Sequence, residues 1–352
     1  MSGFRRGHRD HLGSIRATIA SSRTPRPPGR LARPVLALLS ILTVVSGCDK
    51  AKALAGGGGA EAAEPPASER LDLSRQPEIL FQVFGEREDA RMIPIAVIEA
   101  GRLAPIVLAS AGWKQFDALY GKSGKSYTLY RGGRAVGTAT VRQGMWERPD
   151  EPLYALPNCA LMIPLSRVRL DTRARLGFTV EALASNAPLG RSGGGGVSMA
   201  AAELEQIARG IGEIAAQRAR IASGTLATLS LNALAIETRS GVPPAVIATF
   251  TDPKAEEREA SGGKTASIFA IGEQGEDGVY QIAFSHIVNG AADDADYRRY
   301  IDHLDMDADG TDEIVLEGWD TRGSSFLSVL RSSGGRWSEM FRSRGQWCLD
   351  RG

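Results

Sequence analysis

Short apolar runs dominate the chain between residues 78 and 185. The clearest are 79–84, 93–98, 127–130 and 135–141, which contain many β-branched residues and are separated by glycine, proline and polar stretches. Runs of this length and composition favour strands over helices. We therefore predict that this region is a β-rich α+β domain.

Two local signals add detail to this domain. The segment 131–134, Arg-Gly-Gly-Arg, separates two of the apolar runs and is typical of a β-hairpin turn. The stretch 112–119 has its large apolar residues, Trp113, Phe116 and Leu119, on one face of a helix. We expect one short helical segment within an otherwise β domain.

A glycine-rich linker is predicted at 186–198, followed by a helix at 199–222. Apolar residues recur in the second segment at helical spacing: Leu204, Ile207, Ile211, Ile214 and Ile221. This pattern predicts one amphipathic helix. Its polar face is not enriched in lysine or arginine, as a membrane-surface helix would be, so we expect it to pack on a neighbouring sheet.

The region 225–352 contains an internal repeat. When 234–247 is set beside 303–316, Gly241 falls on Gly310, and an apolar run begins four residues later in each copy. Two further pairs of apolar runs correspond: 267–271 with 325–329, and 279–284 with 336–341. Each copy has the size of a three- or four-stranded antiparallel sheet. Two such units cannot close a propeller, which takes about four to eight blades, so they must stack on each other, on the helix or on the first domain. The whole fold is expected to be mainly β.

The N-terminal segment has the pattern of an export signal. Residues 1–34 are rich in arginine and proline, and 35–45 form an apolar run that is too short for an ordinary membrane-spanning helix but suits a signal-peptide core. The next stretch, Val-Ser-Gly-Cys at 45–48, resembles the lipobox of bacterial lipoproteins. The resemblance implies that 1–47 is a lipoprotein signal peptide and that Cys48 is lipidated. The alternative is an uncleaved signal anchor.

A lipid on Cys48 would attach the protein to a membrane of the cell envelope, on its periplasmic or surface side. Residues 48–77 are rich in alanine, glycine, glutamate and proline, a composition that predicts a flexible tether.

Charge and cysteine content exclude several classes of protein. The chain has a net charge of +1, but its first 47 residues hold eight arginines and one aspartate, a charge of +7, so the remaining residues carry −6. An acidic mature protein is not expected to bind nucleic acid. Three cysteines are too few for a disulfide-dense scaffold. After lipidation of Cys48, Cys159 and Cys348 remain as a candidate disulfide, and the sequence leaves open whether they pair.

Acidic residues alternate in one loop of the second copy. The pattern is Asp305-x-Asp307-x-Asp309-Gly310-x-x-Glu313. Alternating carboxylates point toward one centre, the glycine permits a sharp turn, and the carbonyl of the residue after it can add an oxygen ligand. Hard oxygen ligands in this number select calcium, whereas crowded carboxylates without a cation repel one another. The alternative is a solvated acidic turn without an ion. A structural ion is favoured over a catalytic one because no histidine, lysine or second acidic cluster lies beside it.

This pattern resembles the calcium-binding hairpin loop of the FG-GAP and VCBS repeats of integrin-like propellers, D-x-D-x-D-G-x-x-D/E followed by a strand. The resemblance implies a structural calcium ion bound by Asp305, Asp307, Asp309, the carbonyl of Thr311, and Glu313. It also implies that 225–352 is a pair of propeller-blade-like β repeats. An EF-hand does not fit, since its twelfth position is Leu316 here. In the first copy, the ligand positions hold Ile236, Thr238, Ser240 and Pro244, so that loop is expected to bind no metal.

We predict a membrane-anchored envelope lipoprotein with a binding or scaffolding role, whose partner is an envelope protein or a glycan. The alternative is an envelope hydrolase that uses Ser192 or an acid of the proline-rich loop 145–158. Residues 190–194 fit G-x-S-x-G, but a nucleophile elbow directly follows a strand, whereas this segment continues into further glycines. His286 and His303 are too few for a convincing triad. No catalytic residue is assigned, and a role in binding is favoured over an enzymatic one.

Overall fold

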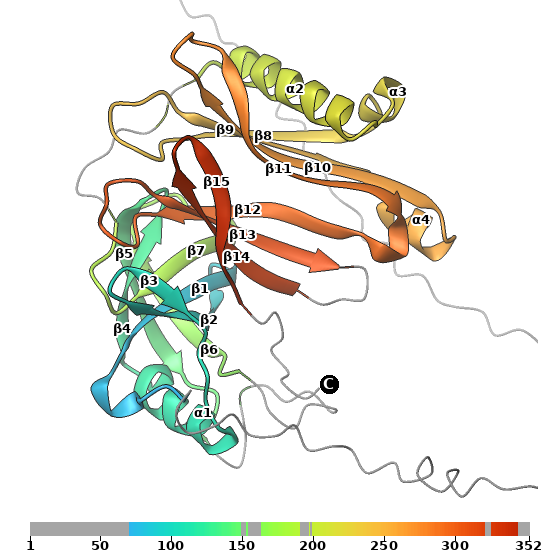
Figure 1. The fold of residues 1–352 in the computed structure, drawn as a ribbon. Helices are drawn as coiled ribbons and strands as arrows, with labels where there is room; N and C mark the ends of the chain where they lie inside the picture. The colour runs from blue at the N-terminus through green and yellow to red at the C-terminus, as the bar shows by residue number, and fades with distance from the viewer. Residues whose placement is uncertain are drawn as a thin grey trace, which may run out of the picture. The chain divides into compact units, whose positions relative to one another are not determined.

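The computed structural model describes residues 70–148, 153, 163–190, 197, 199–320 and 325–343. All of them belong to one compact unit, Ala60–Gly352. The described chain is mainly β, as the sequence predicts, with several antiparallel sheets (Figure 1). The fold prediction counted one amphipathic helix, whereas the structure has four α-helices within the described residues. Helix α1 lies in the helical segment predicted at 112–119, whereas α3 and α4 have four and six residues, and such short segments give little periodic signal.

The first domain is a closed barrel of six antiparallel strands. Their order is β1-β7-β4-β5-β6-β2, pairing of β1 with β2 closes the ring, and a short β3 extends it beyond β2. Closure leaves none of the six strands with an unpaired edge. The strands are β1 (Glu78–Glu86), β2 (Asp89–Glu99), β3 (Arg102–Ala104), β4 (Ser126–Arg131), β5 (Arg134–Gln143), β6 (Ser166–Thr172) and β7 (Thr179–Ser185).

Strand alternation sends the two faces of the barrel wall into different cores. In β1, Ile79, Phe81 and Val83 fill the barrel interior, whereas Leu80 points outward into a second cluster. Successive side chains of a strand face opposite sides, and here both sides are buried. The almost unbroken apolar run that predicted a strand at 79–84 is therefore explained by burial on both faces.

A helical segment packs against the barrel core. Helix α1 (Ser110–Phe116) continues into a π-helical turn (Asp117–Gly121), and its residues Trp113, Phe116 and Tyr120 pack among the interior residues of the barrel. The helical segment predicted at 112–119 is confirmed. The last part of the predicted tether also belongs to the fold, because the 3-10 helix Leu73–Arg75 buries Leu73 in the same core.

The repeated region forms two four-stranded antiparallel sheets. The first sheet has the order β11-β10-β9-β8 and the second sheet the order β12-β13-β14-β15, so that each is a simple meander. The structure shows two such meanders and does not show a propeller. The strands are β8 (Ser230–Ile236), β9 (Ala245–Thr251), β10 (Lys264–Gln274), β11 (Tyr280–Ala291), β12 (Asp296–Leu304), β13 (Glu313–Asp320), β14 (Ser325–Ser333) and β15 (Arg336–Arg342).

Strand pairing corrects the alignment of the two copies by one residue. Ile236 pairs with Ala245 in the first sheet, and Leu304 pairs with Glu313 in the second, so both hairpin loops have eight residues. The copies are therefore offset by 68 residues at these strand ends, not by the 69 that places Gly241 on Gly310. The positions of the first copy that correspond to the acidic ligands become Glu237, Arg239, Gly241 and Ala245. An arginine at one ligand position agrees with the prediction that this loop binds no metal.

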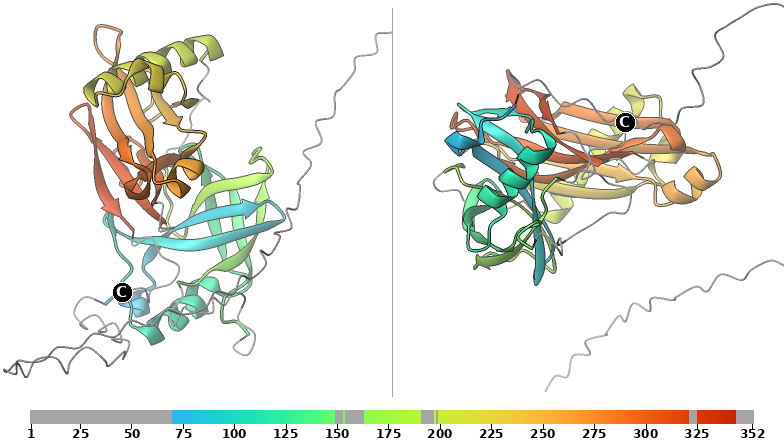
Figure 2. Two further views of the ribbon diagram at one scale, coloured as in Figure 1. Left: turned by 90° about the vertical axis from the view of Figure 1, so that its right-hand side faces the viewer. Right: turned by 90° about the horizontal axis from the view of Figure 1, so that it is seen from below.

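The elements stack in layers, each joined to the next by an apolar cluster. Helix α2 (Ala201–Arg218) covers one face of the first sheet (Figure 1, Figure 2). The other face of that sheet packs on the second sheet through residues such as Ile247 and Leu316. The second sheet in turn packs on the outer wall of the barrel, where Val315 and Leu183 belong to one cluster. Strand β10 is buried along most of its length because it lies between α2 and the second sheet.

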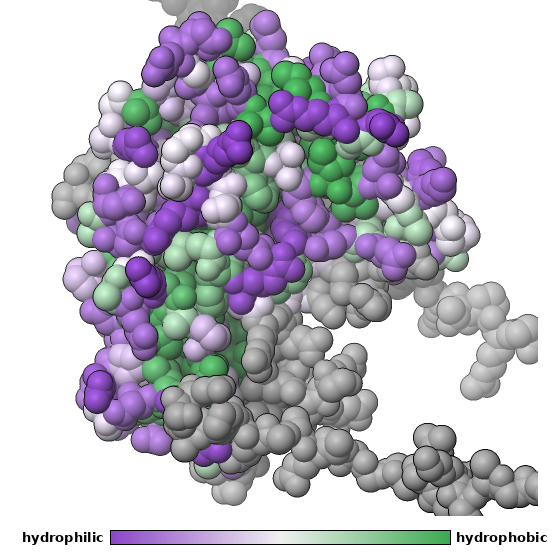
Figure 3. Space-filling view, in the orientation of Figure 1, coloured by the Kyte–Doolittle hydropathy of each residue, from purple (hydrophilic) through white to green (hydrophobic). Residues whose placement is uncertain are grey.

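The predicted amphipathic helix packs on a sheet, as expected. It ends at Arg218, four residues before the predicted boundary, and two shorter helices, α3 (Ser223–Leu226) and α4 (Ala255–Ala260), follow it in the chain. Ile214, assigned to the apolar face, is 40% exposed. Figure 3 shows a face on which hydrophilic residues are most common, with apolar residues gathered next to α2 and over the barrel.

Candidate metal centre

The acidic loop joins β12 to β13, with strands on both sides. Its aspartates fix its own backbone: Oδ2 of Asp305 accepts the N–H of Gly310 (3.0 Å), Oδ1 of Asp307 accepts that of Asp309 (3.2 Å), and Oδ1 of Asp309 accepts that of Thr311 (2.7 Å). Aspartate side chains commonly stabilise turns by bonding the backbone two residues further on. Gly310 adopts a φ of +85°, which glycine reaches without strain.

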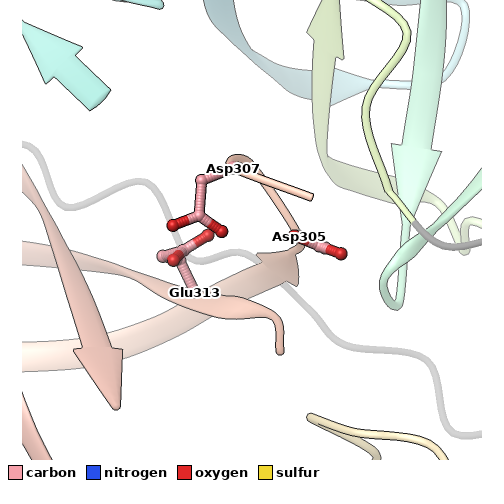
Figure 4. Close-up of side chains that lie close together, drawn as sticks. All are labelled: Asp305, Asp307 and Glu313. Carbon is pink, nitrogen blue, oxygen red and sulfur yellow. The ribbon is translucent and has the colours of Figure 1, made fainter. Parts of the chain in front are cut away.

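Three of the predicted ligands come together. Asp305, Asp307 and Glu313 each offer one carboxylate oxygen, and these atoms all lie within 4.8 Å of one another. Figure 4 shows the carboxylates of Asp307 and Glu313 facing each other, whereas the side chain of Asp305 extends away from this pair. Asp305 and Glu313 are buried and Asp307 is half-buried.

The other two predicted ligands are Asp309, whose carboxylate is not part of this cluster, and the carbonyl of Thr311. Asp309 is exposed and uses its carboxylate to fix the backbone of Thr311. The backbone of Thr311 forms a β-bridge with that of Arg239, in the equivalent loop of the first sheet, and its hydroxyl accepts a hydrogen bond from Nε of the same arginine. The two repeat loops therefore lie side by side, and one contacts the other at the candidate site.

Arg331 of β14 lies against two of the three acids. Its Nη2 is 2.7 Å from Oδ2 of Asp307, its Nε is 2.9 Å from Oε1 of Glu313, and Nη2 also donates to the carbonyl oxygen of Gly101 at 3.1 Å. The second oxygen of Glu313 accepts the N–H of Met306. Burial raises the pKa of Glu313 to about 7, although the hydrogen bonds from Met306 and Arg331 act in the opposite direction.

The donor set fits a hard divalent cation. Oδ1 of Asp305 is buried and has no hydrogen-bond partner within the described part of the chain. A buried carboxylate oxygen without a partner is costly, and a bound cation would compensate it. Calcium takes six to eight oxygen ligands, which carboxylates supply singly or in pairs. Three carboxylates that each offer one oxygen would supply three ligands of that shell.

A second polar cluster lies at the end of β12, just before the same loop, and corrects the sequence-based expectation that no histidine or second acidic cluster lies beside the site. Oδ1 of Asp302 accepts the N–H groups of Gly132, in the β4–β5 turn of the barrel, and of His303. The hydroxyl of Tyr300 lies 2.6 Å from Nδ1 of His303 and 3.4 Å from Oδ1 of Asp302. Oδ2 of Asp302 lies 3.7 Å from Nη1 of Arg131. Burial raises the pKa of Asp302 to about 6.

Strand β12 contains several charged residues besides Asp302, so no local pattern of the sequence distinguishes this cluster. His303, one of the two histidines that are too few for a triad, is a buried strand residue in the structure, and its Nε2 lies 3.6 Å from Oδ2 of the buried Asp312. His286 also lies in a strand, with its Nε2 2.7 Å from the carbonyl oxygen of Asp296.

Several predicted residues fall outside the described part of the chain. They are Cys48, Cys159, Ser192 and Cys348. The start of the 145–158 loop is described, and the buried carboxylate of Asp117 accepts the N–H groups of Met145 (3.0 Å) and Trp146 (2.8 Å). This end of the loop is therefore a packed connector.

No protein-family model, curated protein or solved structure matches this chain. Within the residues that the structure describes, none of the helices has both the length and the apolar character needed to span a membrane. The function is therefore argued from the residues and their geometry.

Proposed function

We propose that this chain is a lipid-anchored protein of the cell envelope whose β-rich body serves as a binding or scaffolding module stabilised by calcium. The partner would be an envelope protein or a glycan. The observation that supports the proposal is the proximity of Asp305, Asp307 and Glu313, each of which has one carboxylate oxygen within 4.8 Å of the others, together with the unpartnered buried oxygen of Asp305. On the basis of the sequence pattern, we also propose that the two meanders are repeats of the FG-GAP or VCBS kind and that only the second has kept its metal loop.

The surroundings of the loop favour a structural ion. Besides its own sheet, the loop contacts the first sheet through Arg239 and Thr238, whose carbonyl oxygen accepts the N–H of Asp312 at 2.7 Å. It also contacts the barrel side, where Arg331 reaches Gly101, and the N–H of Gly190 donates to the carbonyl oxygen of Asp305. An ion that holds this loop would stabilise the junction of all three sheets.

Calorimetry of the purified full chain tests the calcium site. We expect calcium to bind the wild type, and the variants Asp305→Asn and Asp307→Asn to lose that binding, since each removes a charged ligand. Asp277→Asn is the matched control, because Asp277 also fixes a hairpin turn, through the N–H of Val279, but lies in the β10–β11 turn. Absence of calcium binding by the wild type, or equal binding by all four proteins, would contradict the assignment.

The anchor is tested separately by Cys48→Ser. The wild type should enter the detergent phase on partition with Triton X-114 and should carry the mass of a diacylglycerol on its N-terminal residue. The variant should stay in the aqueous phase or keep its signal peptide, because the sulfur that accepts the lipid is missing. A wild type of unmodified mass would refute lipidation without affecting the calcium result.

A further inference from the structure

Arg331 neutralises two of the three acids of the candidate metal centre. Its guanidinium lies 2.7 Å from Asp307 and 2.9 Å from Glu313, and it donates to the carbonyl oxygen of Gly101 at 3.1 Å. A planar guanidinium can hold two carboxylates at once through separate N–H groups, which a lysine ammonium does less well. The side chain is 29% exposed, so it has a route out of the site. The acidic cluster therefore contains an internal cation.

A metal ion and this guanidinium need the same oxygens. Calcium binds carboxylate oxygens at about 2.3–2.6 Å, and Oδ2 of Asp307 and Oε1 of Glu313 are the atoms that Arg331 contacts. A divalent cation beside a guanidinium is also repelled by it, most strongly where the surroundings are poorly solvated. Both cations cannot hold the two carboxylates in the present arrangement.

Asp305 is the one acid of the cluster that Arg331 does not pair with, and it can therefore be the first to bind the metal ion. Its carboxylate is not part of the ion pairs of Arg331 recorded for the described residues, and its Oδ1 is buried without a hydrogen-bond partner. One oxygen of Asp305 nevertheless lies within 4.8 Å of an oxygen of each of the other two acids. The carboxylate of Asp305, which Arg331 does not neutralise, thus lies next to the carboxylates of Asp307 and Glu313, which Arg331 does neutralise.

We propose that Arg331 is a built-in competitor of calcium, which holds Asp307 and Glu313 in the metal-free protein and is displaced when the ion binds. This proposal rests on the calcium site proposed above. Displacement also breaks the hydrogen bond from Arg331 to the carbonyl oxygen of Gly101, in the β2–β3 turn of the barrel. Calcium binding in the second sheet is thereby transmitted to the barrel.

The turn at Gly101 lies very close to the metal loop. Ala100 and Gly101 both have positive φ, and a Cβ built on Gly101 would lie 2.5 Å from Cβ of Asp307. Movement of the Asp307 side chain toward an ion therefore takes place in direct contact with this turn. Ion binding would alter two contacts of the turn, one with Arg331 and one with Asp307.

The test is calcium calorimetry on the full chain with Arg331→Met, which keeps an apolar stem but removes the charge. We expect the variant to bind calcium about tenfold more tightly than the wild type, ~1.4 kcal/mol in binding free energy. Arg336→Met is the matched control, since Arg336 lies in the adjacent strand β15 and is exposed, and its affinity should stay at the wild-type value. Arg331→Lys keeps the positive charge but loses the planar guanidinium that holds two carboxylates, so its calcium affinity should lie between those of the wild type and Arg331→Met. The lysine variant replaces Arg331→Met if the methionine variant does not fold.

The outcomes separate this proposal from the one on which it depends. Wild-type binding that is unchanged or weakened in both Arg331 variants would refute competition and leave the calcium site standing. No binding by any of the proteins would remove the calcium site itself. Binding by Arg331→Met alone would also refute the proposal, because calcium would then not displace Arg331 in the natural protein.

Amide hydrogen exchange gives a second measurement. Calcium should speed exchange in the segment 99–104 of the wild type, because the link from Arg331 to Gly101 is released. It should have little effect on this segment in Arg331→Met, where the link is already absent. Equal responses in the two proteins would refute displacement of Arg331.

Discussion

Buried acids with raised pKa values mark three places in the structure. Asp117 holds the start of the 145–158 loop, Asp302 holds the β4–β5 turn of the barrel, and Glu313 belongs to the candidate metal centre. In all three, burial is the largest cause of the raised pKa, and hydrogen bonds to the carboxylate oppose it. The first two acids bond backbone N–H groups of a separate segment, and therefore act as structural clamps.

The pKa of Asp302 makes stability depend on pH. Burial raises its pKa from the ordinary value of 3.8 to about 6 in the folded protein, so the folded state binds the proton more tightly than the unfolded state. The stability that this carboxyl contributes is fully present below pH 3.8 and is lost as the pH rises through about 6. Two pKa units correspond to at most about 3 kcal/mol of unfolding free energy.

Asp302→Asn should remove this part of the pH dependence. An asparagine can still accept the N–H groups of Gly132 and His303 but does not titrate. Urea unfolding at pH 4, 5, 6 and 7 should show a smaller fall in unfolding free energy for the variant than for the wild type, and Asp277→Asn should keep the wild-type slope. A parallel pair of curves for Asp302→Asn and the wild type would contradict the prediction.

Among the elements, helix α2 shows how tertiary contacts override helix propensity. It contains two glycines, Gly210 and Gly212, which both weaken an isolated helix relative to alanine. A Cβ on Gly210 would meet no heavy atom within 4 Å, whereas a Cβ on Gly212 would lie 2.3 Å from the ring of Phe250 in β9. Gly212 therefore permits the helix to approach the first sheet closely, and Gly210 does not contribute to that packing.

The two alanine substitutions should have opposite effects. Gly210→Ala should raise the unfolding free energy by about 0.5–1 kcal/mol through helix propensity alone. Gly212→Ala gains the same propensity but must displace the aromatic ring, and overpacking of this kind costs about 1–3 kcal/mol. Thermal unfolding followed by circular dichroism measures both. If the two variants shift the melting temperature in the same direction, the close approach of α2 to Phe250 is wrong.

At the scale of the whole molecule, the barrel and the two sheets share cores. The cluster between the barrel and the second sheet includes Leu80 and Leu183 from barrel strands and Leu304 and Val315 from the second sheet, and all four are buried completely. The first and second sheets share another cluster, which includes Ile271 and Leu330. Because each layer buries a face of its neighbour, we expect the layers to unfold as one cooperative unit.

Leu183→Ala tests this expectation. Loss of a fully buried leucine should lower the unfolding free energy by about 2–5 kcal/mol, and Leu234→Ala, at a side chain that is 40% exposed, should cost far less. Hydrogen exchange should show that protection falls together in the barrel strands and in the second sheet. Loss of protection confined to the barrel would show that the layers unfold independently.

The sequence determined the features that depend on local spacing. The strand-like runs, the helix on 199–222, the two equivalent copies and the alternating acids of the metal loop all follow from residues that are neighbours in the chain. Asp305, Asp307 and Glu313 were identified for this reason, since a tight turn alone brings them close. Lipidation at Cys48 and the calcium ion remain predictions from the sequence.

Only the tertiary structure decided how these pieces meet. Arg331 reaches a carbonyl oxygen 230 positions earlier in the chain, and Asp302 reaches Gly132 across 170 positions. No local pattern records such pairs, because they depend on which strand closes the barrel and which faces of the sheets stack. The one-residue correction to the repeat has the same origin: it follows from strand pairing, whereas the alignment of Gly241 with Gly310 rested on residue type. Local spacing in the sequence predicted the three acids, whereas only the tertiary structure placed the guanidinium of Arg331 against Asp307 and Glu313.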